Sequence, residues 1–455
     1  MTSDNRTRFA PQPPTARTSL SSIAFEGLSV YPKSHWMSLL GDFSWTLLGN
    51  GIFAACQWGI IIILAKMVNA EAIGQYSLSQ ALLTPVLTLT AFQLRGVVAS
   101  DVHNEFTNRE YFGFRMITLV IGFLAALVVA LATVHSLKQI QMVGIVGLIQ
   151  SAELASDTLY GFHQRRGNLV RPATSMIMKG LIGLIALSAG IYWWHSVLVG
   201  LAALLATRIA ILVLYDLNKT LGDRNPGLGI RRGYFDWSRH IRLFKVVCYV
   251  GIMAMLSAWI GMIPRYFIQA YLGPRELGVF TAIFSLTAIG LMPVVALGVA
   301  SFVRLARTFS FGPSEQFFQL LGMLLALSFV IGVGGLLLAY FKGQQILTIL
   351  FRPEYAAYTE LLKLTMMIGA VTFLTASLGA SITAARVFKP QVKLLAIVGI
   401  AEALGCWALV PRQGLTGAAI ACLGAAVIQF IGTALVLIVQ WNRRVPMTQA
   451  AAASN

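Results

Sequence analysis

The sequence contains about a dozen apolar stretches, each close to the roughly 20 residues that an α-helix needs to cross a bilayer. Of its 455 residues, 57% are hydrophobic and only 11% are charged, whereas soluble domains average about 25% charged residues. A soluble fold of this size cannot bury so much apolar surface, so lipid must cover much of it. The sequence therefore predicts an all-α polytopic membrane protein.

We place the membrane spans at 43–67, 76–95, 112–134, 141–162, 173–194, 197–216, 246–271, 277–302, 318–340, 358–383, 391–410 and 415–440. Alternate links between these spans hold most of the Lys and Arg residues that make up the net charge of +17. Because basic links stay on the cytoplasmic side, we expect both termini in the cytoplasm of an inner-membrane protein. No cleavable signal peptide is found.

The division into units follows from the spans. We expect a disordered cytoplasmic tail at 1–40, a six-helix lobe at 41–217, a basic cytoplasmic link at 218–243, a second six-helix lobe at 244–441 and a cytoplasmic tail at 442–455. The link mixes arginines with aromatic residues, which suits an amphipathic segment lying on the inner leaflet. Nucleic-acid binding is a weaker interpretation of this link, because it is short and flanked by spans.

A weak internal repeat supports two lobes. Ile73-Gly74-Gln75-Tyr76-Ser77 opens the second span, and Leu277-Gly278-Val279-Phe280-Thr281 opens the eighth. Val199-Gly200 in the sixth span likewise matches Thr416-Gly417 in the twelfth. Repeats of six spans share one orientation, so an axis along the membrane normal would relate them, with a path between them.

Charged residues within spans are the clearest functional signal, because each costs about 2.5–3.5 kcal/mol at mid-bilayer on insertion scales. They are Glu153, Asp157, Lys179, Arg208, Arg265 and Glu402, with Lys66 and Arg95 near span ends, where they can extend to the interface. Arg265 follows Pro264, which interrupts the helical hydrogen bonds and favours a cavity.

Helical spacing places Glu153, Asp157 and Tyr160 on one face, which suits a cation, a proton or pairing with nearby basic residues. Mutual pairing, Arg208 or Lys179 with Glu153 or Asp157, is an open alternative to ligand binding. Two polar residues of the first span, Asn50 and Gln57, face the same cavity or form helix-to-helix hydrogen bonds.

Several chemistries are missing from the sequence. It has no Gly-rich loop with Lys and Ser/Thr for nucleotide phosphates, and no His/Cys spacing for a metal. The four cysteines lie in apolar spans as ordinary core residues. The short outer links disfavour a membrane glycosyltransferase or polymerase, which usually has a large outer loop. We expect no enzyme and no cofactor.

The chain resembles bacterial polysaccharide flippases of the multidrug/oligosaccharidyl-lipid/polysaccharide (MOP) exporter superfamily. The matching segments are Phe43-Ser44-Trp45-Thr46-Leu47-Leu48-Gly49-Asn50, Gln57-Trp58, Leu64-Ala65-Lys66, Gly74-Gln75-Tyr76, Gln93-Leu94-Arg95, Ile263-Pro264-Arg265-Tyr266 and Leu277-Gly278-Val279-Phe280. Asp157 followed by Tyr160-Gly161 is similar in pattern. The agreement covers most of the first, second, fourth, seventh and eighth spans.

This resemblance implies two lobes in a V shape and ion-coupled export of an undecaprenyl-diphosphate-linked oligosaccharide for O-antigen, capsule or exopolysaccharide. The expected substrate-binding residues are Lys66, Arg95, Lys179, Arg208, Arg265, Asn50 and Gln57, and the expected H⁺- or Na⁺-coupling residues are Glu153, Asp157 and Glu402. Partners would be the lipid-linked oligosaccharide, membrane lipid and a polysaccharide polymerase, with no nucleic acid. The alternative is a cation-coupled multidrug exporter of the same fold, which would favour acidic and aromatic residues in its cavity.

Overall fold

The computed structural model describes residues 33–101, 105–221, 237–310, 314–384 and 389–453, and these contain helices and no strand. The N-terminal lobe contains α2 (Lys33–Ile63), the π-helix η1 (Leu64–Val68), α3 (Ala70–Ala91), α4 (Leu94–Ser100), α5 (Asn108–Thr133), α6 (Leu137–Arg165), α7 (Val170–Trp194), α8 (Val197–Ile211), the π-helix η2 (Leu212–Leu217) and α9 (Asn218–Leu221). The C-terminal lobe contains α10 (Trp237–Ile260), α11 (Ile263–Tyr271), α12 (Pro274–Ser285), α13 (Thr287–Ser310), α14 (Ser314–Leu350), the 3₁₀ helix η3 (Pro353–Tyr358), α15 (Thr359–Ala384) and α16 (Lys389–Ala453).

Twelve transmembrane segments can be traced through the described residues. Ten helical stretches are long and apolar enough to cross a membrane. One of them, Pro390–Asn442, is two helices that meet at Gly414, where φ is 61°. Helix α6 is too polar to be among the ten, yet its 29 residues cross beside the others. The predicted polytopic all-α fold is confirmed.

Three of the predicted spans are each divided into two helices. The second span is interrupted at Phe92 and Gln93, which both adopt left-handed backbone angles between α3 and α4. The seventh span breaks before Pro264, which lies in the first turn of α11, where a missing N–H costs nothing. The eighth is divided at Leu286, between α12 and α13.

The two repeats meet each other at equivalent positions. A Cβ atom built on Gly74 would lie only 1.7 Å from the carbonyl oxygen of Pro274 and 3.1 Å from the nitrogen of Gly278. Three residues after Gly278, the hydroxyl of Thr281 donates to Ser77 Oγ at 2.7 Å, and these two residues match in the repeat. Equivalent groups contact one another in this way when a two-fold axis relates two units, so the crossing of α3 and α12 supports the repeat.

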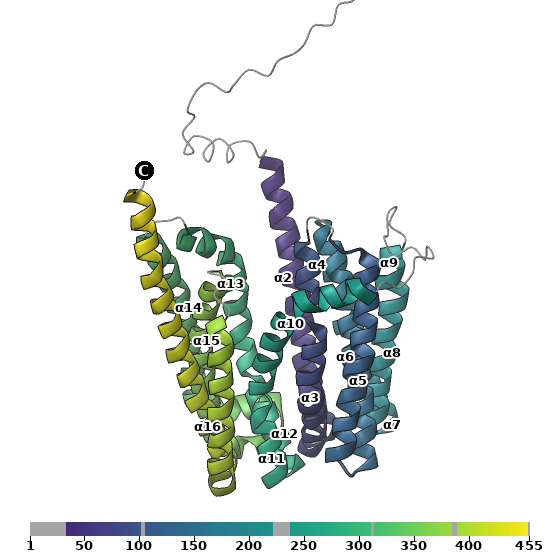
Figure 1. Ribbon diagram of the computed structural model, residues 1–455. Helices are drawn as coiled ribbons and strands as arrows, with labels where there is room; N and C mark the ends of the chain where they lie inside the picture. Colours follow the sequence, from purple (N-terminus) through teal and green to yellow (C-terminus); the bar gives the residue numbers. More distant parts are fainter. Residues whose placement is uncertain (1–32, 102–104, 222–236, 311–313, 385–388, 454–455) are drawn as a thin grey trace, which may run out of the picture.

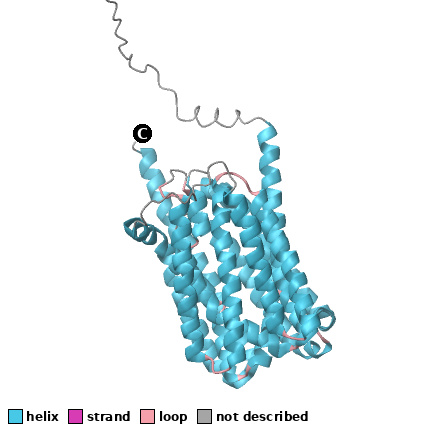
Figure 2. Cartoon of the chain, turned by 90° about the vertical axis from the view of Figure 1, so that its right-hand side faces the viewer, coloured by secondary structure: helices cyan, strands magenta, loops and turns pink. Residues whose placement is uncertain are grey.

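The lobes are in contact at one end of the molecule and diverge at the other (Figure 1). We call the end where α2 begins and α16 ends the terminal face, and the opposite end, with Gly273 and Gly414, the far face. Loops gather at these two ends, and helices run between them (Figure 2). At the far face, Arg352 Nη2 donates to the carbonyl oxygens of Lys66 at 2.9 Å and Val68 at 2.8 Å.

Helix α10 joins the lobes near the terminal face. Its Leu243 and Val247 are completely buried in a cluster with Phe92 and Phe114 of the N-terminal lobe. Its later part packs against α16 in the C-terminal lobe. Of the predicted terminal and linking units, residues 1–32 and 222–236 lie outside the described residues.

Candidate functional site

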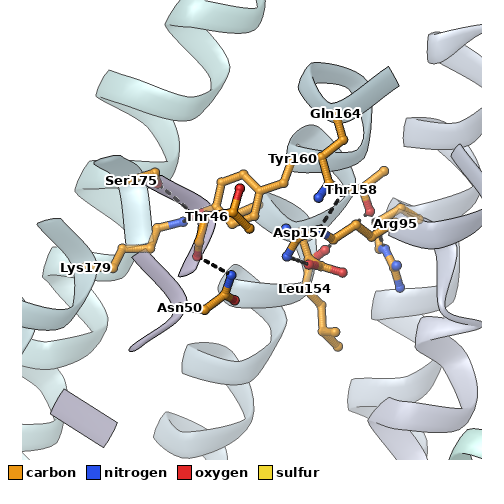
Figure 3. Close-up of polar contacts among 12 residues, drawn as sticks. Thr46, Asn50, Arg95, Leu154, Asp157, Thr158, Tyr160, Gln164, Ser175 and Lys179 are labelled. Carbon is orange, nitrogen blue, oxygen red and sulfur yellow. Dashed lines mark hydrogen bonds and ion pairs between the residues drawn. The ribbon is translucent and has the colours of Figure 1, made fainter. Parts of the chain in front are cut away.

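One face of α6 carries the polar centre of the N-terminal lobe. Asp157, Tyr160 and Gln164 follow one another at helical spacing, with Glu153 one turn earlier. Figure 3 shows this face lying between Arg95 on one side and Lys179 on the other. The continuous helix α6 thus places Glu153, Asp157 and Tyr160 on one face, as their spacing predicts.

Arg95 forms a partly exposed ion pair with Asp157. Its Nη1 lies 3.1 Å from Asp157 Oδ1, and its Nε donates to Gln164 Oε1 at 3.0 Å. The guanidinium also lies 5.5 Å from the ring centre of Tyr160. Side-chain exposure is 22% for Arg95 and 34% for Asp157, so solvent or a ligand can reach this pair.

Lys179 lies deeper and is surrounded by oxygen atoms. Its Nζ contacts Asp216 Oδ2 at 2.6 Å, the Tyr160 hydroxyl at 3.0 Å and the Ser156 hydroxyl. Lys179 and Asp216 are 2% and 3% exposed, so the ammonium is fully compensated inside the lobe. We did not predict Asp216 from the sequence, although an acid at the end of an apolar span was a usable signal. The π-helix η2 brings it to Lys179.

Arg208 pairs with Glu153. The Nε atom lies 3.1 Å from Glu153 Oε1, and the guanidinium lies 5.1 Å from the ring centre of Phe53. Gln57 Nε2 donates to the same carboxylate oxygen at 3.2 Å. The alternative of mutual pairing thus holds for Arg208 and Glu153. Lys179 also has an acidic partner, but a different one from those we considered.

A cavity of about 590 Å³, which we call the N-lobe cavity, lies beside Glu153 and reaches Ser285 of the other lobe. Its wall carries the amides of Gln57, Gln80 and Gln150, the aromatic rings of Trp58 and Tyr76, and the carboxylate of Glu153. Gln80 Nε2 donates to the Tyr76 hydroxyl at 2.8 Å, and Gln150 donates to Gln80. Trp58 Nε1 donates to Ser285 Oγ at 3.1 Å, and this hydrogen bond joins the two lobes at the cavity wall. The amides of Gln80 and Gln150 were not predicted.

Arg115 is a further cation that the sequence did not single out, because it lay in a basic link. It is 1% exposed in α5, and its Nε donates to Thr158 Oγ1 at 2.7 Å. Its Nη2 has no hydrogen-bond partner among the described residues. Thr158 neighbours Asp157 in sequence, so Arg115 adds positive charge behind the Arg95–Asp157 pair.

Arg265 and Glu402 lie in the other lobe, apart from this network. The Arg265 Nη1 atom contacts Met262 Sδ at 2.6 Å, and its buried Nε has no partner in the described chain. Glu402 is 4% exposed, and its Oε2 has no hydrogen-bond partner among the described residues. Lys66 is exposed in η1 at the far face. Asn50 is exposed and donates to the carbonyl oxygen of Thr46, four residues earlier in its own helix, at 2.7 Å.

A second cavity of about 570 Å³, the C-lobe cavity, lies among α10, α13, α15 and α16 and is closed on one side by Gln93 of the N-terminal lobe. Gln93 is two residues from Arg95, but Arg95 and Asp157 themselves are not among the residues that line this cavity. Its polar wall consists of hydroxyls and amides, including Thr372, Thr375, Thr383, Gln429 and Thr433. We had not predicted any of these residues.

The class of protein is defined by two six-helix lobes and by cavities that carry polar groups in their walls. The chain has the fold of the multidrug and toxic compound extrusion (MATE) transporters of the MOP superfamily. It aligns with an outward-facing MATE multidrug transporter at a TM-score of 0.63 and 13% identity, covering 90% of this chain and 96% of that one. An inward-facing MATE multidrug transporter gives a TM-score of 0.61 at 14% identity, over 89% and 95% of the two chains.

A curated relative is similar along most of its length. The capsular polysaccharide biosynthesis protein CapF of Staphylococcus aureus is 21% identical over 394 residues, which cover 84% of this chain and 95% of that protein. No family model matches the chain. Together, the relative and the fold support the resemblance to polysaccharide flippases of the MOP superfamily.

Proposed function

We propose that this protein carries a lipid-diphosphate-linked oligosaccharide across a bacterial inner membrane, for assembly of a surface or secreted polysaccharide. The observation that carries the proposal is the partly exposed Arg95–Asp157 pair, in a lobe that also contributes to the walls of two cavities large enough for a small ligand. The similarity to a capsular polysaccharide biosynthesis protein supports a role in polysaccharide assembly. A two-lobed fold suits alternating access around a central site.

The diphosphate needs a counter-charge while its headgroup crosses roughly 30 Å of hydrocarbon. We assign this role to Arg95, whose planar guanidinium forms paired hydrogen bonds with phosphate oxygens. In the present state Asp157 is paired with the Arg95 guanidinium, and the arriving phosphate takes the place of Asp157. Lys179 and Arg208, each 2% exposed and paired, keep the network in position behind this exchange.

Ion coupling belongs to the same proposal. Glu402 is a buried carboxyl group with Cys406 and Cys422 as neighbours. Hard cations such as Na⁺ prefer several oxygen ligands, and these sulfur neighbours supply none, so we assign Glu402 to proton coupling. Glu153 and Asp157 are the corresponding candidates in the N-terminal lobe, where the arriving phosphate takes the place of Asp157 at Arg95.

The main alternative is export of cationic drugs. Glu153 lies in a cavity with Trp58 and Tyr76, which is the kind of wall that such cargo favours. Arg208, however, lies 3.1 Å from this carboxylate and neutralises it. We therefore prefer the anionic lipid cargo.

Depletion of the protein in its own strain tests the proposal. Prenyl-linked oligosaccharides should then accumulate on the cytoplasmic leaflet, and surface polysaccharide should fall. An Arg95→Ala allele should fail to restore export, whereas wild-type protein should restore it. Unchanged prenyl-linked pools, together with increased sensitivity to cationic drugs, would favour the alternative.

A further inference from the structure

The wall of the C-lobe cavity is largely apolar, and its polar groups are uncharged. Among the described residues that line it, the polar side chains are hydroxyls and amides, and no Lys, Arg, Asp or Glu is present. Elsewhere in the membrane part of the chain, carboxylates and basic residues are frequent and mostly paired. The described wall of this cavity therefore offers no group of opposite charge to a charged ligand.

The hydroxyls of this wall are arranged to accept hydrogen bonds. Thr372, Thr375 and Thr383 recur at helical spacing along α15, and each donates its proton to a carbonyl oxygen of its own helix at 2.8 Å. Thr433 of α16 does the same at 2.6 Å. Because each hydroxyl proton is already donated to a backbone carbonyl, the threonine oxygens offer their lone pairs to a ligand as acceptors.

Other residues complete a wall suited to sugar rings. The Gln429 amide can both donate and accept, and the half-exposed ring of Tyr249 offers an apolar face. A neutral sugar carries many hydroxyl donors and apolar C–H faces, and it brings no charge that must be compensated. The wall matches these groups.

The N-lobe cavity has no surplus positive charge either. Its one lining carboxylate, Glu153, is balanced by Arg208 at 3.1 Å, and its other polar groups are mainly amides and hydroxyls. An acidic sugar placed in this cavity would meet Glu153. Both cavities therefore disfavour a glycan that carries carboxylates.

We infer that the saccharide part of the cargo is electrically neutral and is bound in the C-lobe cavity, while the diphosphate engages Arg95. This inference rests on the proposed function and specifies the class of its substrate. A uronic-acid residue in the C-lobe cavity would lose its hydration without gaining a partner of opposite charge, which is costly. The protein would thus select against acidic repeat units.

Binding to the purified full-length protein tests the inference with three probes. The first is bare undecaprenyl diphosphate, the second carries a disaccharide of neutral hexoses, and the third carries the same disaccharide with its terminal hexose oxidised to the uronic acid. Dissociation constants are measured in detergent micelles by microscale thermophoresis. The neutral glycolipid should bind more tightly than the bare lipid, and the acidic one about tenfold or more weakly than the neutral one.

Two variants separate the cavity from the overall charge of the protein. Gln429→Arg adds a cation to the cavity wall and should abolish the discrimination against the acidic glycolipid. Gln413→Arg makes the same change at an exposed position outside the cavity and should leave the discrimination intact. If Gln429→Arg fails to fold, Thr383→Lys at an exposed edge of the cavity takes its place.

The outcomes distinguish the inference from the proposed function. Acidic and neutral glycolipids that bind equally, or an acidic one that binds more tightly, would overturn the inference. So would a neutral glycolipid that binds no better than the bare lipid, although Arg95 could still engage the diphosphate. Failure of all three lipids to bind would count against the proposed function itself.

Discussion

The glycine pair at the crossing of α3 and α12 gives the sharpest test of how the lobes close. A Cβ added at Gly74 would lie 1.7 Å from the Pro274 carbonyl oxygen, whereas a carbon–oxygen contact is usually about 3.3–3.6 Å. Because the obstructing atom belongs to the backbone, the two helices must separate by about 1.5 Å or more. Gly74→Ala should therefore weaken closure at the far face.

Overpacking of this kind costs about 1–3 kcal/mol, which corresponds to a shift of about 5–150-fold in the equilibrium between two conformations. The separation can be followed by electron paramagnetic resonance, with spin labels on the exposed residues Leu137 and Ile349, one in each lobe. The partly exposed Cys248 is replaced beforehand. The distance between the labels should increase in Gly74→Ala. Gly144→Ala is the matched control, because a Cβ there has no neighbour within 4 Å.

Closure through this contact also predicts non-additivity. A Cβ on Gly278 would meet the Ala70 carbonyl oxygen at 1.7 Å, in the same crossing. Once Gly74→Ala has separated the helices, Gly278→Ala should add little, so the double variant should cost less than the sum of the single ones. Label distances in Gly74→Ala that match those in wild type would refute the closure of the lobes described here.

Four further predictions test the polar network, the contact between the lobes at the far face and Glu402. Arg95→Ala should abolish export, measured as surface polysaccharide, and Arg95→Lys should retain part of it; full export by Arg95→Ala would contradict phosphate contact. Lys179→Ala should lower the free energy of unfolding by about 3–5 kcal/mol, and the apolar pair Lys179→Met with Asp216→Leu should recover much of it, as measured by thermal unfolding in detergent. Arg352→Ala removes two hydrogen bonds between the lobes and should lengthen the far-face label distance without changing the unfolding temperature much. Glu402→Gln should make transport insensitive to an imposed pH gradient, and an unchanged response would exclude Glu402 from proton coupling.

The fold was largely predictable from the sequence because apolar length and the distribution of basic residues report directly on membrane spans. The repeat around Gly74 and Gly278 indicated two related units, but it did not predict that the lobes meet at these two glycines. Helix breaks were harder to predict. Phe92 and Gln93 both adopt left-handed backbone angles although neither is a glycine. Tertiary packing, and no local sequence signal, imposes this turn.

The candidate site was predicted in part. Helical spacing placed Glu153, Asp157 and Tyr160 on one face, and all three lie in the continuous helix α6. Spacing within one helix cannot show which partner comes from another helix, so the pairing of Lys179 with Asp216 was missed. The uncharged cavity in the C-terminal lobe was missed for a related reason, since buried threonines and glutamines are also common where helices simply pack together.

Translocation in proteoliposomes tests the central proposal most directly. The purified full-length protein is reconstituted with an undecaprenyl-diphosphate-linked neutral oligosaccharide, and the fraction exposed on the outer leaflet is followed with a membrane-impermeant oxidant. Wild-type protein should speed the movement of the glycolipid between leaflets far above the rate in empty liposomes, and Arg95→Ala should return it to that background. A wild-type rate no faster than empty liposomes, with uptake of cationic dyes instead, would contradict the proposed function.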